Sequence, residues 1–230
     1  MPVLPGAPPL EVHLKRVARA RRFSLRVSRL DGKVTLSIPA RARETEAMAF
    51  LRGQEGWLRQ TLAAMPMAIV QPVALGSAVP VEGRLLTLVL GAGRSIRAEG
   101  GHLLIPGSPA LAPVRLEAWL KVLARDRLLR ASDHHAALIG RRFTKLTLRD
   151  TRSRWGSCSH DGGLMYSWRL IMAPPSVLDY VAAHEVAHLA EMNHSAAFWR
   201  VVDRLCPGWK TERDWLRGEG QGLHHYRFWD

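Results

Sequence analysis

The chain has 230 residues, 47% of them hydrophobic, and a formal net charge of +13. This length suits one large or two small domains, and the charge favours anionic partners such as nucleic acid, acidic polypeptide or phosphorylated metabolites, unless it only solvates the surface. Cys158 and Cys206 are too few for a disulfide scaffold, and no continuous apolar segment opens the chain, so we expect a cytoplasmic protein outside the membrane.

The first predicted element is a hairpin. Apolar and polar residues alternate over 23–27 and again over 34–38, on either side of Asp31-Gly32. A period of two on both sides of a glycine-containing turn predicts two paired β-strands.

A helix and further strands follow the hairpin. Apolar residues recur at helical spacing over 44–64, although Gly53 and Gly56 weaken this helix. Three apolar runs divided by glycine turns predict short strands between 79 and 106, and a long helix is expected over about 113–139.

The remaining chain mixes strands and helices. An alternating segment from 143 and the run 164–172 predict strands, with a turn-rich stretch between them. Ser176 is expected to cap a helix that continues to about Asn193, and another helix covers 195–205 before an aromatic tail. The predicted fold class is α+β, with a β-rich region containing one helix at 1–110 and a second domain at 111–230.

Ionisable residues occupy an apolar part of the expected helix, in the stretch HEVAHLAEMNH at 184–194. His184 and His188 are four residues apart, so their imidazoles lie on one helix face and can bind one metal ion. Glu185 lies about 100° round the helix, where it can act as general base toward a metal-bound water. Because burying these groups without a partner is costly, we prefer a shared zinc ion to a surface helix with spare histidines.

The third metal ligand has two candidates. A catalytic zinc ion takes three protein ligands and keeps one open position. Glu191 lies on the same helix face, but it is too far along the axis from His184 for one straight helix to close round an ion. Asn193 can end the helix and let His194 turn back. We therefore predict one Zn²⁺ per chain, bound by His184, His188 and His194, and leave Glu191 as a supporting carboxylate or surface charge.

Several segments form a set with these residues: RWGSCS at 154–159, Arg169-Leu170 with Pro174, YVAAHEVAHLAEMNHSAAFW at 180–199, and Pro207. The set resembles the YgjP-like family of zinc metallohydrolases, related to the SprT-like and WLM proteases, most strongly over 141–216. The resemblance implies a zincin-like domain with a metal-bearing helix, a second helix and a small sheet. It also implies the same three histidine ligands and catalytic glutamate.

The resemblance leaves the turn after the metal helix open. The histidine spacing equals that of metzincin proteases, but Glu191 stands where those enzymes use glycine to turn the chain. We therefore expect a different turn.

The segment RDTRSRWGSCSHDGG precedes the metal helix. Its glycines and serines suit an exposed strand beside a cleft, along which a substrate backbone could pair. The candidate substrate-binding residues are Arg152, Arg154, Trp155, Gly156 and Ser157. The alternative is that Trp155 belongs to the core and the arginines are solvated. For an oxyanion stabiliser the sequence leaves open Tyr166, Tyr226, Asn193, Arg154 and the pair His224-His225.

Three functions follow from these observations. The first hypothesis is a zinc-dependent metallopeptidase acting on a polypeptide, with Glu185 as the base. The second is a metal-dependent phosphohydrolase, such as a nucleotide pyrophosphatase, in which arginines hold an anionic small molecule. The third is a nucleic-acid-associated module with structural zinc, which predicts a closed site with four ligands.

Overall fold

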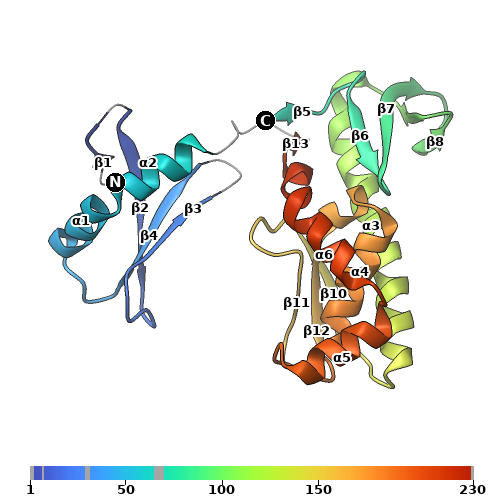
Figure 1. Ribbon diagram of the computed structural model, residues 1–230. Helices are drawn as coiled ribbons and strands as arrows, with labels where there is room; N and C mark the ends of the chain where they lie inside the picture. The colour runs from blue at the N-terminus through green and yellow to red at the C-terminus, as the bar shows by residue number, and fades with distance from the viewer. Residues whose placement is uncertain (1–2, 7, 29–31, 65–69, 229–230) are drawn as a thin grey trace. The chain divides into compact units, whose positions relative to one another are not determined.

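The computed structural model describes four stretches of the chain, residues 3–6, 8–28, 32–64 and 70–228. The fold is mixed α and β, as predicted, and the chain divides into two units, Met1–Ile69 and Val70–Asp230 (Figure 1). This division differs from the boundary predicted near residue 110. The strands between 78 and 106 share one apolar core with the long helix after them, so they pack with the second unit.

The first unit contains a sheet with the strand order β1-β2-β4-β3. Leu25 of β3 lies opposite Leu36 of antiparallel β4, which confirms the predicted pairing of the hairpin strands, while Asp31 of its turn lies outside the described residues. Strand β4 also pairs in parallel with β2, with Val12 opposite Val34. The strands are β1 (Val3–Leu4), β2 (Leu10–Val17), β3 (Ser24–Val27) and β4 (Val34–Pro39).

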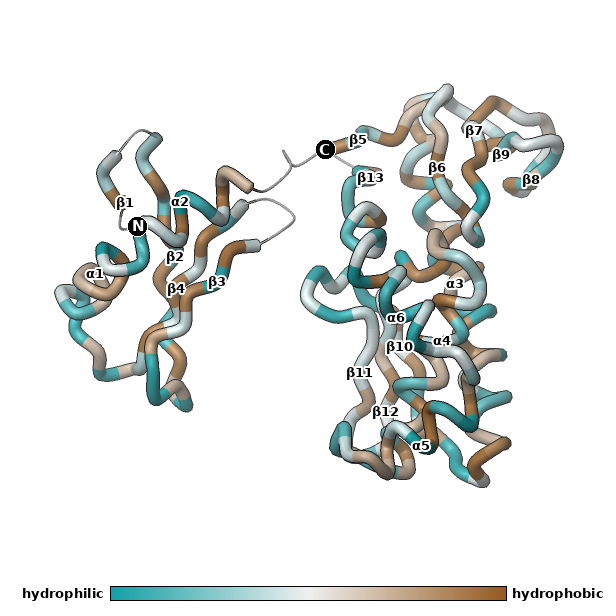
Figure 2. Tube along the Cα trace, in the orientation of Figure 1, coloured by the Kyte–Doolittle hydropathy of each residue, from teal (hydrophilic) through white to brown (hydrophobic). Residues whose placement is uncertain are grey.

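The helix predicted over 44–64 is two helices, α1 (Glu44–Gly53) and α2 (Glu55–Ala63). Gln54 separates them with non-helical dihedral angles, φ −104° and ψ 5°. Glycines on both sides of this residue, Gly53 and Gly56, make a continuous helix less favourable. The two helices bury Ala47, Leu51 and Leu58 in one cluster with the apolar residues of β2 and β4, whose alternation is visible in Figure 2.

The second unit begins with a sheet of order β6-β7-β9-β8, in which β7 and β9 are parallel. Its elements are β5 (Gln71–Pro72), β6 (Ala78–Val81), β7 (Arg84–Gly91), β8 (Arg97–Glu99), β9 (His102–Pro106), the 3-10 turn η1 (Pro109–Leu111) and helix α3 (Ala112–Leu138). Strand β5 pairs with β13 (Tyr226–Arg227) near the C-terminus.

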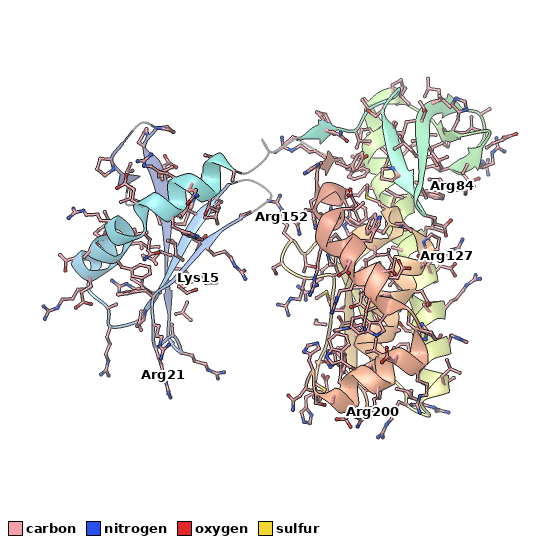
Figure 3. All side chains as sticks on the ribbon, in the orientation of Figure 1. Lys15, Arg21, Arg84, Arg127, Arg152 and Arg200 are labelled. Atoms are coloured by element: carbon pink, nitrogen blue, oxygen red, sulfur yellow. The ribbon has the colours of Figure 1, made fainter. Side chains whose placement is uncertain are left out.

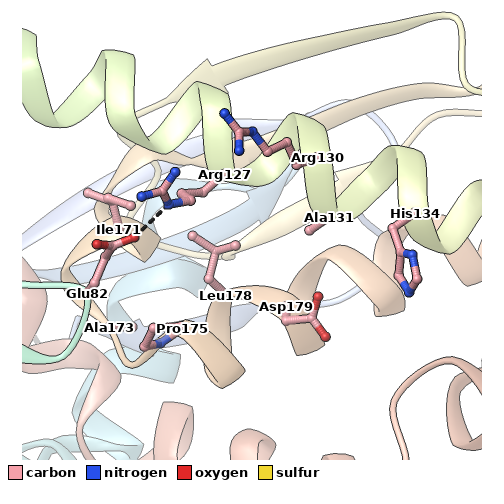
Figure 4. Close-up of a pocket in the computed structure, with 10 residues that line it drawn as sticks. All are labelled: Glu82, Arg127, Arg130, Ala131, His134, Ile171, Ala173, Pro175, Leu178 and Asp179. Atoms are coloured by element: carbon pink, nitrogen blue, oxygen red, sulfur yellow. Dashed lines mark hydrogen bonds and ion pairs between the residues drawn. The ribbon is translucent and has the colours of Figure 1, made fainter.

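The turn between β6 and β7 attaches this sheet to the rest of the unit. Glu82 has a positive φ of 49°, and its backbone N–H donates to the Ile171 carbonyl at 2.7 Å. Its carboxylate accepts from Arg127 Nε of α3 at 2.6 Å (Figure 4). Gly83 follows with φ +75°, and a Cβ there would lie 3.0 Å from Pro174 Cα, so only glycine fits without adjustment. The turn is therefore fixed against the segment that precedes the next helix.

A three-stranded sheet of order β10-β12-β11 comes next, formed by β10 (Lys145–Arg149), β11 (Gly156–Cys158) and β12 (Gly163–Ser167). The strand predicted over 164–172 ends at Ser167 and becomes the 3-10 segment η2 (Trp168–Met172). All five residues of η2 are buried, and a continuous apolar run does not distinguish a strand from a buried helical turn.

Three helices and a 3-10 turn complete the second unit: α4 (Pro175–Ala187), α5 (Ala196–Leu205), α6 (Trp209–Gly218) and η3 (Gly220–His224). Helix α4 starts with Pro175 in its first turn, where proline's missing N–H costs nothing. It ends at Ala187, six residues before the predicted end at Asn193. Helix α5 has the predicted extent, and Ser195 caps it by accepting a hydrogen bond from the Phe198 N–H at 3.3 Å. Among the helices of the described residues, none has the length and apolar character needed to cross a membrane.

Candidate metal centre

The end of α4 and the loop after it bring three histidines together. His184 lies in the last turn of α4, His188 directly follows the helix, and His194 lies just before α5. One ring nitrogen from each lies within 4.8 Å of the others, and the Nε2 atoms of His184 and His194 are 3.1 Å apart. Three imidazole nitrogens at this spacing can bind one cation.

The chain turns by a route that the sequence did not indicate. The helix stops at Ala187, whose carbonyl accepts from the backbone N–H groups of Ala190 and Glu191, each at 3.0 Å. His188 Nδ1 is 3.1 Å from the Glu191 carbonyl. Since this backbone oxygen can only accept, Nδ1 carries the proton and Nε2 has a free lone pair. Glu191 thus supports His188 through its backbone carbonyl. Its carboxylate forms no hydrogen bond with any described residue, so a supporting role for the carboxylate stays a prediction.

The ring of Phe198 packs against all three imidazoles. Its side chain is fully buried, and its ring centroid lies 5.0 Å, 4.5 Å and 4.8 Å from those of His184, His188 and His194. Burial, together with the other two imidazoles, lowers the pKa of His184 to about 4, and burial also lowers the pKa of His188. Neutral imidazoles are the form that binds metal ions.

The donor set fits a zinc ion with an open position. Within the part of the chain that the structure describes, the cluster contains three histidines and no cysteine, aspartate or glutamate. The Nε2 atoms of His184 and His194 face each other at 3.1 Å, and one cation between them would satisfy the lone pairs of both. A closed structural site would need a fourth ligand.

Glu185 lies beside the histidines and is 6% exposed. Burial raises the pKa of its carboxyl group to about 8, while the Arg154 charge and the Cys158 backbone N–H act in the opposite direction. Strand β11 lies directly against it: a Cβ on Gly156 would be 2.6 Å from both Cγ and Oε1 of Glu185. The glycine therefore permits the close approach that fixes the position of the carboxylate.

Four of the five predicted substrate-binding residues line the cavities near the histidines, and Arg152 does not. Gly156 and Ser157 belong to β11, an edge strand of its sheet, and Arg154 and Trp155 directly precede it. Trp155 packs against the core and stacks on His224 at 5.2 Å, and it also lines a cavity, so its contact with substrate stays a prediction. Arg152 is exposed in the loop before β11 and does not line the cavities at the histidines (Figure 3).

Two cavities adjoin at Glu185. The smaller, about 260 Å³, is lined by the three histidines, Glu185, Met192 and the residues Gly156, Ser157 and Cys158. The larger, about 310 Å³, shares Gly156, His184 and Glu185 and continues toward α6. Burial raises the pKa of the Cys158 thiol to about 11, so it is protonated at neutral pH and unsuited to act as a nucleophile.

Besides Val181, four residues of the larger cavity were not predicted as site residues: Tyr180, Arg213, Leu216 and Arg217. Tyr180 lies one turn before His184 on α4, so helical spacing offered a signal for it. The other three belong to α6, which the sequence pattern placed in an aromatic tail.

Of the candidates for an oxyanion stabiliser, only Arg154 lines one of the two cavities. Tyr166 is fully buried and its hydroxyl pairs with Ser132 at 3.0 Å, so it is engaged elsewhere. His224 lies against Trp155, Asn193 is exposed in the loop after α4, and neither Tyr226 nor His225 lines the two cavities. Arg154 lines the larger cavity with Glu185.

A buried arginine holds the substrate segment to the C-terminal turn. Arg169 is 4% exposed and donates through Nε and Nη2 to the Asp150 carboxylate at 2.7 Å and 3.0 Å. Its Nη1 donates to the carbonyls of Leu223 and Tyr226. These bonds connect the chain before β11 with η3, whose His224 supports Trp155. A bidentate, charge-assisted pair in a buried position is strongly oriented.

His224, which stacks on Trp155, makes the stability of the protein depend on pH. Burial and the nearby Arg169 lower its pKa to about 4 from an ordinary value of 6.5, although Asp150 opposes the shift. The unfolded chain therefore binds the proton more tightly, and the stability contributed by neutral His224 is complete above about pH 6.5 and is lost as the pH falls toward 4. We expect His224→Phe, which keeps a stacked ring, to reduce the slope of unfolding free energy against pH in this interval.

The measurement is urea denaturation of the metal-free protein between pH 4 and 8. Loss of one linked proton lowers the slope by at most about 1.4 kcal/mol per pH unit. His102→Phe, at an exposed position of β9, is the matched control. Identical slopes for the wild type and His224→Phe contradict the expectation.

The chain is similar in sequence to one protein family, and it is similar to one solved structure. The family described as YgjP-like, metallopeptidase domain, matches residues 21–219. The search of curated proteins found no match. Among solved structures, one described as the crystal structure of the metallopeptidase zymogen of Pyrococcus abyssi abylysin is similar, with 21% sequence identity and a TM-score of 0.36. The similarity covers 40% of this chain and 95% of that chain.

Proposed function

Because the chain belongs to the YgjP-like family of metallopeptidase domains, we propose that it hydrolyses peptide bonds with one zinc ion held by His184, His188 and His194. The observation that carries the proposal is the convergence of three imidazole nitrogens within 4.8 Å beside the buried carboxyl group of Glu185. Three ligands leave the open position that a catalytic zinc site requires.

Glu185 is the proposed general base. Zinc bound at the histidines would supply a Lewis acid that polarises the scissile carbonyl and acidifies water. Glu185 takes a proton from the water that adds to the carbonyl carbon, and it passes a proton to the amide nitrogen as the C–N bond breaks. Burial raises the pKa of this carboxyl group to about 8 without a metal ion, and a nearby cation would lower the pKa, which favours the carboxylate that accepts the proton.

Strand β11 is the proposed support for an extended substrate. It is an edge strand, and its Gly156 and Ser157 line the cavity that contains the histidines. A peptide can pair with such an edge through backbone hydrogen bonds, which bind it without regard to most side chains. Arg154 and Trp155 then lie where they can contact side chains of the substrate.

The other two hypotheses receive less support. The matched family is described as a metallopeptidase domain, and this description names neither phosphohydrolase activity nor nucleic-acid binding. A structural zinc site would need a fourth ligand, and the described histidine cluster contains none. We keep the cytoplasm as the proposed location, since neither of the two cysteines is paired.

The test uses the full chain with measured zinc content. We expect one zinc ion per chain and cleavage of an unstructured protein such as casein, together with a fall in rate of at least about 100-fold on chelation and recovery with zinc. Nucleoside triphosphates, assayed in parallel, should release no phosphate or pyrophosphate. Pyrophosphate release without peptide cleavage would support the phosphohydrolase instead, and protein without metal that does not bind added zinc would contradict both.

A further inference from the structure

The larger cavity beside Glu185 is positively charged. Three guanidinium groups line it, from Arg154, Arg213 and Arg217, against the single carboxyl group of Glu185. Arg154 comes from the loop before β11 and the other two from α6, so segments distant in sequence converge on the cavity. Such a lining favours an anionic ligand.

The arginines of α6 are only partly neutralised by their neighbours. Arg213 lies over the ring of Trp209 at 4.7 Å, and its buried Nε has no hydrogen-bond partner among the described residues, with an Asp214 oxygen 3.5 Å away. Arg217 lies 3.3 Å from the same oxygen in an exposed pair, of the kind that contributes little. One exposed carboxylate therefore pairs with two guanidinium groups, and each guanidinium group has further N–H donors that can bind a ligand.

The other walls of the cavity are largely apolar, and its size limits what can enter. Trp155, Val181 and Leu216 line it, together with Tyr180, whose phenol stays protonated because burial raises its pKa to about 12. A volume of about 310 Å³ lies at the low end of ligand pockets, which suits a small part of a peptide. The cavity thus offers apolar walls for the body of a side chain or terminal residue and guanidinium donors for its anionic end.

We infer that this cavity binds a carboxylate of the peptide substrate next to the scissile bond, an inference that rests on the proposed peptidase function. Its position fits, since Gly156, His184 and Glu185 line this cavity as well as the smaller one. The guanidinium group presents a planar set of donors that matches a carboxylate. The carboxylate comes from a glutamate or aspartate side chain or from the C-terminus of the peptide.

Matched peptides distinguish the two sources. They share one sequence that the zinc-loaded protein cleaves, and they carry Glu, Gln or Lys at each position flanking the scissile bond, with a free or amidated C-terminus. For a side-chain carboxylate, we expect kcat/KM to favour Glu over Gln at one position by about 10–100-fold, mainly through KM. For a terminal carboxylate, the free acid is favoured over the amide by a similar factor. Equal values in both comparisons overturn the inference.

Charge-reversal variants assign the preference to the cavity. Arg154→Glu and Arg213→Glu should each remove the preference for the carboxylate and improve cleavage of the Lys peptide. Arg84→Glu makes the same charge change at an exposed position of β7 and should keep the wild-type preference (Figure 3). Arg213 packs on Trp209, so its variant must first be checked for folding, whereas Arg154 is exposed and provides the second, independent test. A preference that survives in both folded variants overturns the inference.

A binding measurement separates this inference from the proposed function. Zinc-loaded Glu185→Gln protein is titrated with fluorescent Glu, Gln, free-acid and amidated peptides, and anisotropy gives each Kd. If no peptide is cleaved by the wild type, the peptidase proposal fails, and an Arg154-dependent preference in Kd still supports recognition of a carboxylate. Cleavage without any preference in KM or Kd overturns the inference and leaves the peptidase proposal intact.

Discussion

Glu185→Gln should lower kcat for peptide cleavage by about 10²–10⁴-fold, the contribution of a positioned general base, while the protein keeps its fold and its zinc. Glutamine has nearly the same shape but cannot take a proton from water. The three histidines are unchanged, so the metal content measured by elemental analysis should remain at one zinc ion per chain.

Stability provides a second readout for this variant. Burial raises the pKa of Glu185 to about 8, above its ordinary value of 4.5, so in the metal-free protein the charged form opposes folding above pH 4.5 and most strongly above pH 8. The neutral amide removes that cost, and the free energy of unfolding of the metal-free variant at pH 8.5 should equal or exceed that of the wild type. Activity is then lost without loss of stability.

The matched control is Glu191→Gln, which makes the same chemical change six residues further along. Glu191 supports His188 through its backbone carbonyl, and the substitution leaves this carbonyl in place. Its kcat should stay within about twofold of the wild type, as expected for a partly exposed side chain outside special features. Full activity in Glu185→Gln would contradict the role of Glu185 as base, and a large loss in Glu191→Gln would restore a role for that carboxylate.

Local spacing carried most of the information about the candidate metal centre. The four-residue separation of His184 and His188 places them on one helix face, and His194 follows six residues later, close enough for a turn to bring it to the same ion. The turn itself was not predictable from spacing. It depends on a hydrogen bond from His188 to the Glu191 carbonyl, and any residue type supplies a carbonyl.

Long-range packing explains what the sequence did not indicate. Arg213 and Arg217 are on α6, about 30 residues after the motif glutamate, and only the packing of α6 against α4 brings them to the larger cavity. The strands between 78 and 106 have the alternation of an independent sheet, yet they share a core with α3. In η2, the buried guanidinium of Arg169 donates to Asp150 before β11 and to the Leu223 carbonyl in η3. The sequence around Arg169 does not indicate these distant partners.

Gly156→Ala should reduce kcat for peptide cleavage by about 100-fold or more, although alanine adds only one methyl group to β11. Gly156 has a backbone conformation open to other residues, so strain in φ is not the cause. The added Cβ would lie 2.6 Å from Cγ and Oε1 of Glu185, closer than real contacts allow. Because Glu185 is buried, and β11 is paired with β12 on its other side, the carboxyl group must shift from its position beside the histidines.

The control for this substitution is Gly222→Ala, since nothing lies within 4 Å of a Cβ added there. Both variants should bind one zinc ion, because neither substitution changes His184, His188 or His194. We expect Gly222→Ala to retain wild-type kcat, and we expect Gly156→Ala to lose it with little change in KM, because the shift affects the base more than the binding of the peptide backbone. Wild-type kcat in Gly156→Ala would contradict this prediction, because it would show that the reaction does not depend on the position of the Glu185 carboxyl group.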